Sequence, residues 1–202
     1  MLRRIWLLLL LAPVLFGCGS GLEEGGRIPV PRPFGLSSGE QVVMVVGSPA
    51  TYRGSGSFED ISTTDDISAV KQYVLFQTLQ ARGLVTGSSE PTITLSGFEA
   101  TITVSDAQDS VRFENLSIDG QVTLTRRADG EYDVTVTGSR GSGLRAVIGE
   151  AEQAKLVRLA RIVTSGGTNT VEVVLRAQVS PSLPSGTRIT LTAGTGTGTL
   201  EL

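Results

Sequence analysis

Residues 91–137, PTITLSGFEATITVSDAQDSVRFENLSIDGQVTLTRRADGEYDVTVT, form the stretch that decides the fold. Apolar residues alternate with threonine or charged residues along most of it, as in the tetrapeptide TITL at positions 92–95. This period of two places one set of side chains on a buried face of a sheet and the other set in solvent. The pairs Asp119-Gly120 and Asp129-Gly130 are typical of hairpin turns, because these residues tolerate positive φ. The pattern therefore predicts an antiparallel meander of roughly four or five strands.

Segments on both sides of this stretch add strands. Residues 42–46 and 171–175 are short apolar runs rich in valine, too short for a helix and typical of buried strands. The last segment, 188–202, alternates threonine with glycine near its end, so Gly196 and Gly198 lie on one face of the predicted strand. Glycine within a strand often marks the close approach of another part of the chain or of a ligand.

Two segments predict helices. Over residues 149–163, Leu156, Leu159 and Val163 recur at helical spacing on one face. Residues 66–82 follow a cluster of serine, threonine and aspartate that suits a helix N-terminus.

The end of this second helix is also marked, because Gly83 is placed as a left-handed C-cap. However, the run Tyr-Val-Leu-Phe at 73–76 has high strand propensity, so a strand is the alternative reading of the segment.

Together these elements predict an α+β fold, a mainly antiparallel meander or sheet with two helices packed on it. We expect one domain over residues 41–202, with helices near 66–82 and 149–163. The 202-residue chain has no histidine and one cysteine, which removes the commonest general base and the commonest metal ligand. Its formal net charge of −3 predicts no nucleic-acid partner. No cofactor, metal site or catalytic residue is predicted.

The first residues, MLRRIWLLLLLAPVLFGC, have the pattern of a targeting segment. Arg3 and Arg4 precede an apolar run over 5–11, which is shorter than the about 20 residues that a helix needs to cross a bilayer. Residues 1–17 are therefore predicted to be a signal peptide.

The tetrapeptide Leu15-Phe16-Gly17-Cys18 resembles the bacterial lipobox, although Phe16 departs from the usual small or aliphatic residue. The resemblance implies that Cys18 is acylated and becomes the mature N-terminus, anchoring the chain to the membrane of the bacterial cell envelope. Since Gly19 is not aspartate, it also implies the outer membrane where two membranes are present. The alternatives are an ordinary secretory signal and an uncleaved anchor.

Residues 18–40 are rich in glycine, serine and proline and show no periodicity, so we expect a tether that carries the lipid. The alternation of Pro29, Pro31 and Pro33 favours extended polyproline II, either as a spacer or as a recognition motif.

Three groups of side chains could carry chemistry or contacts. Ser68 and Lys71 have the S-x-x-K spacing and resemble the first motif of the penicillin-binding and serine β-lactamase family, but only over these two residues. A solvated lysine is the simpler interpretation. Acidic residues could bind calcium, but their spacing is not that of an EF-hand, and helix capping or loop solubility is the simpler interpretation. These residues are Glu59, Asp60, Asp65, Asp66, Asp106 and Asp109.

Lys155, Arg158 and Arg161 line the polar side of the helix predicted at 149–163. They could face anionic lipid headgroups or form an ordinary solvated helix face.

The favoured function is therefore a non-catalytic binding or scaffold lipoprotein of the envelope, with a protein partner or a hydrophobic ligand. The first alternative is a carrier of lipid or another hydrophobic ligand in a pocket between sheet and helices. A Ser/Lys hydrolase is the second.

Overall fold

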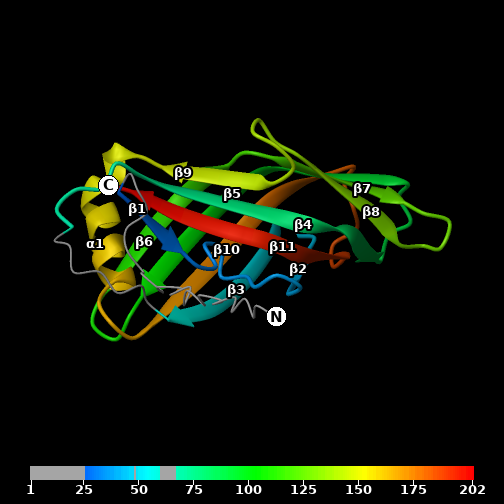
Figure 1. Ribbon diagram of the computed structural model, residues 1–202. Helices are drawn as coiled ribbons and strands as arrows, with labels where there is room; N and C mark the ends of the chain where they lie inside the picture. The colour runs from blue at the N-terminus through cyan, green and yellow to red at the C-terminus, as the bar shows by residue number, and fades with distance from the viewer. Residues whose placement is uncertain (1–25, 48, 60–66) are drawn as a thin grey trace, which may run out of the picture.

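The computed structural model describes residues 26–47, 49–59 and 67–202 (Figure 1). Within these ranges the chain forms a sheet of 11 strands and one α-helix, which a short 3-10 turn precedes. The strands are β1 (Arg27–Val30), β2 (Gln41–Val45), β3 (Ala50–Glu59), β4 (Gln72–Thr86), β5 (Thr92–Ser105), β6 (Ser110–Ile118), β7 (Gln121–Arg126), β8 (Tyr132–Thr137), β9 (Leu144–Ile148), β10 (Thr168–Ser180) and β11 (Arg188–Glu201).

The sheet closes on itself. Its strands follow the order β11-β2-β3-β10-β5-β7-β8-β4, and β4 pairs again with β11 to complete the circuit. All of these pairings are antiparallel, so the sheet-dominated class predicted from the alternating sequence is confirmed. The long strands β4, β5, β10 and β11 run through most of the length of the molecule (Figure 1). The closed sheet therefore has an inner face, which holds the core, and an outer face.

The region 91–137 is less simple than the predicted meander. Ile118 of β6 pairs with Phe98, and Val122 of β7 pairs with Leu95, so β6 and β7 follow one another along the same edge of β5. The hairpin predicted at Asp119-Gly120 is therefore wrong. The backbone of Asp119 instead exchanges hydrogen bonds with Arg145 at 2.7 and 2.9 Å, so a neighbouring strand satisfies the groups that a tight turn would pair internally.

The second Asp-Gly pair does form a hairpin. Arg126 of β7 pairs with Tyr132 of β8, and Gly130 at the turn has a φ of 90°. Positive φ at this position is what the Asp-Gly signal predicts.

The segment 66–82 is not a helix, and this prediction is corrected. Residues 60–66 lie outside the described residues, and from Gln72 the chain is the strand β4. Tyr73 and Leu75 are buried, whereas Val74 and Phe76, which alternate with them, are half-buried, and this is the two-residue period of a sheet. The strand propensity of this run and its pairing on both edges, with β11 and with β9, outweigh the helix-start signal before it.

Gly83 consequently lies inside β4 and is not a helix cap. A Cβ atom at this position would lie 2.9 Å from Cγ2 of Val134, so glycine here permits two strands to approach closely.

The second predicted helix is confirmed. A 3-10 turn, η1 (Glu150–Glu152), leads into α1 (Gln153–Val163), whose buried side chains are Leu156, Leu159, Ala160, Ile162 and Val163. The helix covers one end of the closed sheet and packs mainly on β6 (Figure 1). In the part of the chain that the structure describes, no helix combines the length and apolar character needed to cross a membrane.

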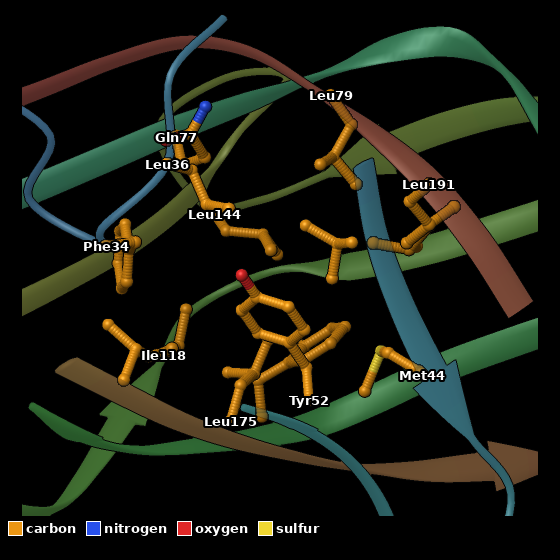
Figure 2. A pocket seen from close by; sticks show the side chains of 14 residues that line it. Phe34, Leu36, Met44, Tyr52, Gln77, Leu79, Ile118, Leu144, Leu175 and Leu191 are labelled. Atoms are coloured by element: carbon orange, nitrogen blue, oxygen red, sulfur yellow. The ribbon is translucent and has the colours of Figure 1, made fainter. Parts of the chain in front are cut away.

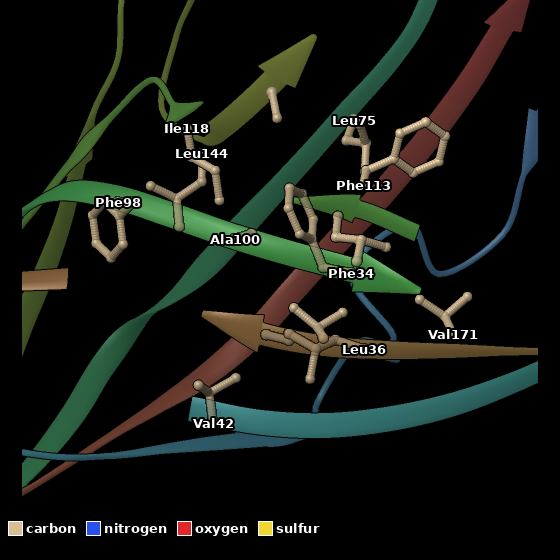
Figure 3. Close-up of a cluster of buried hydrophobic side chains, with 14 of the residues drawn as sticks. Phe34, Leu36, Val42, Leu75, Phe98, Ala100, Phe113, Ile118, Leu144 and Val171 are labelled. Atoms are coloured by element: carbon tan, nitrogen blue, oxygen red, sulfur yellow. The ribbon is translucent and has the colours of Figure 1, made fainter. Parts of the chain in front are cut away.

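The predicted tether also differs from the structure, because the chain is already part of the domain before residue 40. Arg27–Val30 forms β1 on the edge of β11. Residues 31–40, which we call the strap, connect β1 to β2, and Phe34 and Leu36 within it are buried. Figure 3 shows both side chains among the core residues of the sheet. Proline suits this path, since edge positions and irregular connections need no complete ladder of N–H donors.

The glycine-rich end of β11 lies against the rest of the chain, as its sequence predicted. A Cβ atom on Gly198 would lie 2.8 Å from the carbonyl oxygen of Val30. On Gly196 it would overlap the side chain of Gln77.

Candidate functional site

A small apolar cavity lies inside the closed sheet. Its volume is about 40 Å³, and its walls come from the strap, β2, β3, β4, β10, β11 and neighbouring strands (Figure 2). Almost all of the lining side chains are apolar, among them Phe34, Leu36, Met44, Leu144 and Leu191. The exceptions are Tyr52 and Gln77, which bring polar atoms to this part of the core.

Glycine on the inner face of β3 makes room for the site. A Cβ atom on Gly54 would overlap the hydroxyl end of Tyr52, so the aromatic ring can lie along the strand only because residue 54 has no side chain. A Cβ atom on Gly56 would lie 2.5 Å from the carbonyl oxygen of Gly35 in the strap. The Gly-Ser-Gly sequence of β3 thus admits both the tyrosine ring and the strap to the interior.

The hydroxyl group of Tyr52 points into the middle of the cavity (Figure 2). It forms no hydrogen bond with any residue that the structure describes. Burial and the nearby carboxylate of Glu40 raise the pKa of this phenol above its ordinary value. The group therefore stays protonated at neutral pH and can both donate and accept a hydrogen bond.

Gln77 carries the other polar group of the cavity. Its side chain is 3% exposed, and Nε2 donates to the carbonyl oxygens of Thr78 and Gly194, each at 3.1 Å. These two acceptors fix the orientation of the amide, because an oxygen in that place would face two carbonyl oxygens. Oε1 of Gln77 is left buried without a hydrogen-bond partner. Such an acceptor costs about 1–3 kcal/mol when it stays unpaired.

The structure does not join Ser68 to Lys71. Both residues are exposed in the segment just before β4, outside the cavity. Nζ of Lys71 donates to the carbonyl oxygen of Leu202 at 2.7 Å, while its backbone N–H donates to Glu201 at 2.7 Å. The lysine thus holds the last strand in place and is not directed at a nucleophile.

The three basic residues lie on the solvent side of α1, and two of them form ion pairs. Lys155 is 2.9 Å from the carboxylate of Glu152. Two nitrogens of the Arg158 guanidinium group donate hydrogen bonds to the carboxylate of Asp109. The same group also donates to the backbone carbonyl oxygen of Ser110 at 2.8 Å. Arg161 forms no ion pair with a described residue. Arg158 therefore ties α1 to the β5–β6 turn.

The carboxylates of that turn accept hydrogen bonds from backbone N–H groups and so stabilise the turn. Oδ1 of Asp106 accepts from the N–H groups of Gln108 and Asp109 at 2.8 and 2.6 Å, and Oδ2 accepts from the hydroxyl of Ser165 at 2.9 Å. The backbone donors lower the pKa of Asp106, and Arg158 lowers the pKa of Asp109.

The remaining acidic residues considered for calcium binding do not form a metal site among the described residues. Glu59 accepts a hydrogen bond from Thr168 at 3.4 Å. Asp60, Asp65, Asp66 and Cys18 fall outside the described residues. Over residues 26–47, 49–59 and 67–202, no group of three or more acidic, cysteine or histidine side chains is placed to hold a metal ion.

Sequence reasoning missed Tyr52 and Gln77. Gln77 follows Tyr73 and Leu75 at a period of two, so it is a polar residue on the inner face of β4. This pattern can be recognised only when the segment is known to be a strand. No protein-family model matches the chain, and comparison with curated proteins gave no match. The cavity must therefore be interpreted from its own chemistry.

Proposed function

We propose that this chain is a non-catalytic binding lipoprotein of the bacterial envelope, which holds a small, mainly apolar molecule inside its closed sheet. The observation that carries the proposal is the cavity bounded by the strap and the inner face of the sheet. Apolar walls with a few placed polar groups are typical of small-molecule sites.

The size of the cavity limits the ligand. A water molecule needs roughly 10–15 Å³ of such space, and a cavity of about 150 Å³ holds benzene. The 40 Å³ found here admits a molecule of only a few heavy atoms while the strap stays in place. The site thus favours a small ligand over a complete lipid, and it lies within the sheet rather than between sheet and helices.

The absence of paired reactive groups in the cavity supports a binding role. Tyr52 and Gln77 are the polar side chains that line it, and neither is placed beside a nucleophile or a second titratable group there. Among the described residues, the ion pairs are exposed to solvent and lie outside the cavity, as in the pair Arg82–Asp133. A Ser/Lys hydrolase has less support, because Ser68 and Lys71 are outside the cavity.

The anchor in this proposal is Cys18, on the resemblance of residues 15–18 to the lipobox. Seven residues lie between Cys18 and Gly26, so the eight steps from one Cα atom to the next span at most about 29 Å at 3.6 Å each. The carbonyl oxygen of Gly26 accepts a hydrogen bond from Leu202 at 2.7 Å, beside the end that α1 covers (Figure 1). Anchoring would then turn this end, with Lys155, Arg158 and Arg161, toward the bilayer, in the outer membrane where the cell has two.

A scaffold role is the second candidate, and it has its own observation. Val45 and Leu84 are 42% and 48% exposed. They lie on the two strands that flank β11, at neighbouring register positions opposite Arg188 and Thr190. An exposed apolar pair on the two strands beside β11 suits a protein partner.

Intact-mass analysis of the native protein tests the proposal. We expect a chain that begins at Cys18, with added mass from acyl groups, and a small apolar molecule released on denaturation. A Cys18→Ser variant should leave the membrane fraction and keep its fold. An unmodified chain that begins at Met1 would refute the anchor, and failure of every small apolar probe to enter the cavity would refute the binding role.

A further inference from the structure

We infer that the strap is a displaceable plug, and that the interior of the sheet takes an uncharged hydrocarbon large enough to replace the side chains of Phe34 and Leu36. This inference rests on the binding role proposed above and names the class of ligand. It starts from residues 33–36, which are all buried. A strand of the sheet would bury every second residue instead. The strap therefore passes through the interior, as Figure 3 shows for its two large side chains.

The strap fills a seam at which the sheet is not continuous. β2 and β3 are joined by a single residue pair, and the rest of β3 pairs only with β10 among the described strands. A Cβ atom on Gly198 of β11 would lie 3.1 Å from Cβ of Pro33 in the strap. A Cβ atom on Gly56 of β3 would lie 2.5 Å from the carbonyl oxygen of Gly35. The strap thus bridges β11 and β3 and completes the wall of the cavity.

Few hydrogen bonds hold the strap to the strands. Over residues 33–38 the backbone bonds stay within the strap among the described residues, as where the N–H of Gly35 donates to Arg32 at 2.8 Å. The bonds to strands lie near its ends, since Nη1 of Arg32 donates to the carbonyl oxygen of Ser57 at 2.7 Å, and Gly39 donates to β11 at 2.8 Å. Residues 33–38 can therefore leave the interior without breaking the hydrogen-bond ladder of any strand.

The exchange of strap for ligand is close to balanced. A hydrocarbon of the combined size of the two strap side chains buries as much apolar surface as the strap gives up. The space of about 40 Å³ that the strap leaves unfilled favours the ligand, because a void forfeits dispersion contacts with its walls.

The walls define the chemistry of the ligand. They are apolar apart from Tyr52 and Gln77, so a charged group would be buried there without a partner (Figure 2). The ligand is therefore an uncharged hydrocarbon. n-Butylbenzene is a suitable probe, since its ring can take the place of Phe34 and its alkyl chain that of Leu36.

Thiol labelling separates displacement of the strap from entry beneath a fixed strap. Leu36→Cys is made in the full-length Cys18→Ser chain, so that the introduced thiol is the only one. Its reaction with a water-soluble maleimide is timed with and without n-butylbenzene. We expect the ligand to accelerate labelling roughly tenfold or more, because the withdrawn strap exposes the thiol. Phe34→Cys provides a second variant if Leu36→Cys does not fold.

A matched control is Leu191→Cys in the same Cys18→Ser chain. This position lines the same cavity from β11 and is likewise buried, at 3% exposure. Because β11 stays in the sheet, n-butylbenzene should leave labelling at this position unchanged or slow it.

Arg32→Ala tests the hold of the strap independently. Loss of the hydrogen bond to Ser57 weakens the closed arrangement, so n-butylbenzene should bind roughly three- to tenfold more tightly. Xenon fits the cavity while the strap stays in place and should bind with unchanged affinity. Arg53→Ala, at an exposed position of β3, is the control and should change neither affinity. Both affinities are measured through the NMR signals of the methyl groups that line the cavity.

The outcomes separate the two levels of the proposal. If n-butylbenzene binds but slows labelling at Leu36→Cys, the ligand lies beneath a fixed strap, so the binding role stands and the plug is refuted. Binding of xenon alone also refutes only the plug, as does an equal affinity of Arg32→Ala and the unaltered protein for n-butylbenzene. If neither probe shifts the methyl signals, both the inference and the proposed binding role fail.

Discussion

β4, with 15 residues, and α1, with 11, are both rich in apolar residues, yet their backbone hydrogen bonds are satisfied in opposite ways. β4 pairs with β11 along one edge and with β9 and β8 along the other, so its N–H and C=O groups depend on distant parts of the chain. α1 satisfies its backbone within its own turns and contributes one buried face, which contains Leu156 and Leu159. The strand is therefore part of the closure of the sheet, whereas the helix covers one end of it.

The largest effect should come from a proline in β4. Val74 pairs with Thr199 on one side and Val147 on the other. Val74→Pro removes a backbone donor from a strand with two neighbours and should cost about 3 kcal/mol or more, enough to prevent closure. Far-UV circular dichroism and urea unfolding measure this loss. Val74→Thr keeps the N–H group and serves as the control, and a stable Val74→Pro protein would show that closure does not depend on β4.

Truncation of buried leucines compares the two elements directly. Leu75 and Leu159 are both fully buried, at 0% exposure. Each change to alanine should cost about 2–5 kcal/mol, with Leu75→Ala toward the upper end because β4 is packed between two neighbours. Hydrogen exchange should then show opening of the whole sheet for Leu75→Ala but only of α1 for Leu159→Ala. Identical exchange patterns would mean that helix and sheet unfold as one unit.

A smaller effect is expected from the contact between α1 and the β5–β6 turn. The pKa values of Asp106 and Asp109 are lowered in the folded state, by backbone donors and by Arg158. Their stabilisation is therefore complete above the unfolded pKa near 3.8 and is lost as pH falls through the lower folded values. Amide exchange in α1 should accelerate below about pH 4. In Asp109→Asn this acid dependence should weaken, and an unchanged profile would contradict the role of the ion pair.

The smallest expected effect concerns Arg161, which lies on the exposed side of α1. Arg161→Glu should lower the unfolding free energy by at most about 1 kcal/mol, because the side chain forms no ion pair with a described residue but lies in the last turn of α1, where the helix dipole favours a cation. If the α1 end faces anionic lipid, vesicle binding by the unlipidated domain should fall roughly fivefold or more. The same change at Arg188, at the start of β11 and therefore at the other end of that strand from Glu201, is the control. Equal vesicle binding by both variants would contradict the proposed orientation.

Much of the fold could be predicted from local pattern, and the failures have a common cause. The period of two over 91–137, the turn at Asp129-Gly130 and the helix at 149–163 were correct because short-range geometry decides each of them. The hairpin at Asp119-Gly120 and the helix at 66–82 were wrong because pairing with distant strands overrode a local signal. The cavity residues Tyr52 and Gln77 were missed for the same reason, since nothing local shows that two strands face one interior.

Local sequence was enough to show which segments are amphipathic and with what period, because side-chain direction follows directly from backbone geometry. It also supplied the lipobox resemblance at Cys18, which the described residues do not reach. Tertiary pairing alone made residues 72–86 extended, placed Phe34 and Leu36 of the strap in the interior and left Oε1 of Gln77 without a hydrogen-bond partner. These features depend on which distant strands pair and on how completely their side chains fill the enclosed space, and neither is encoded in any single stretch of the chain.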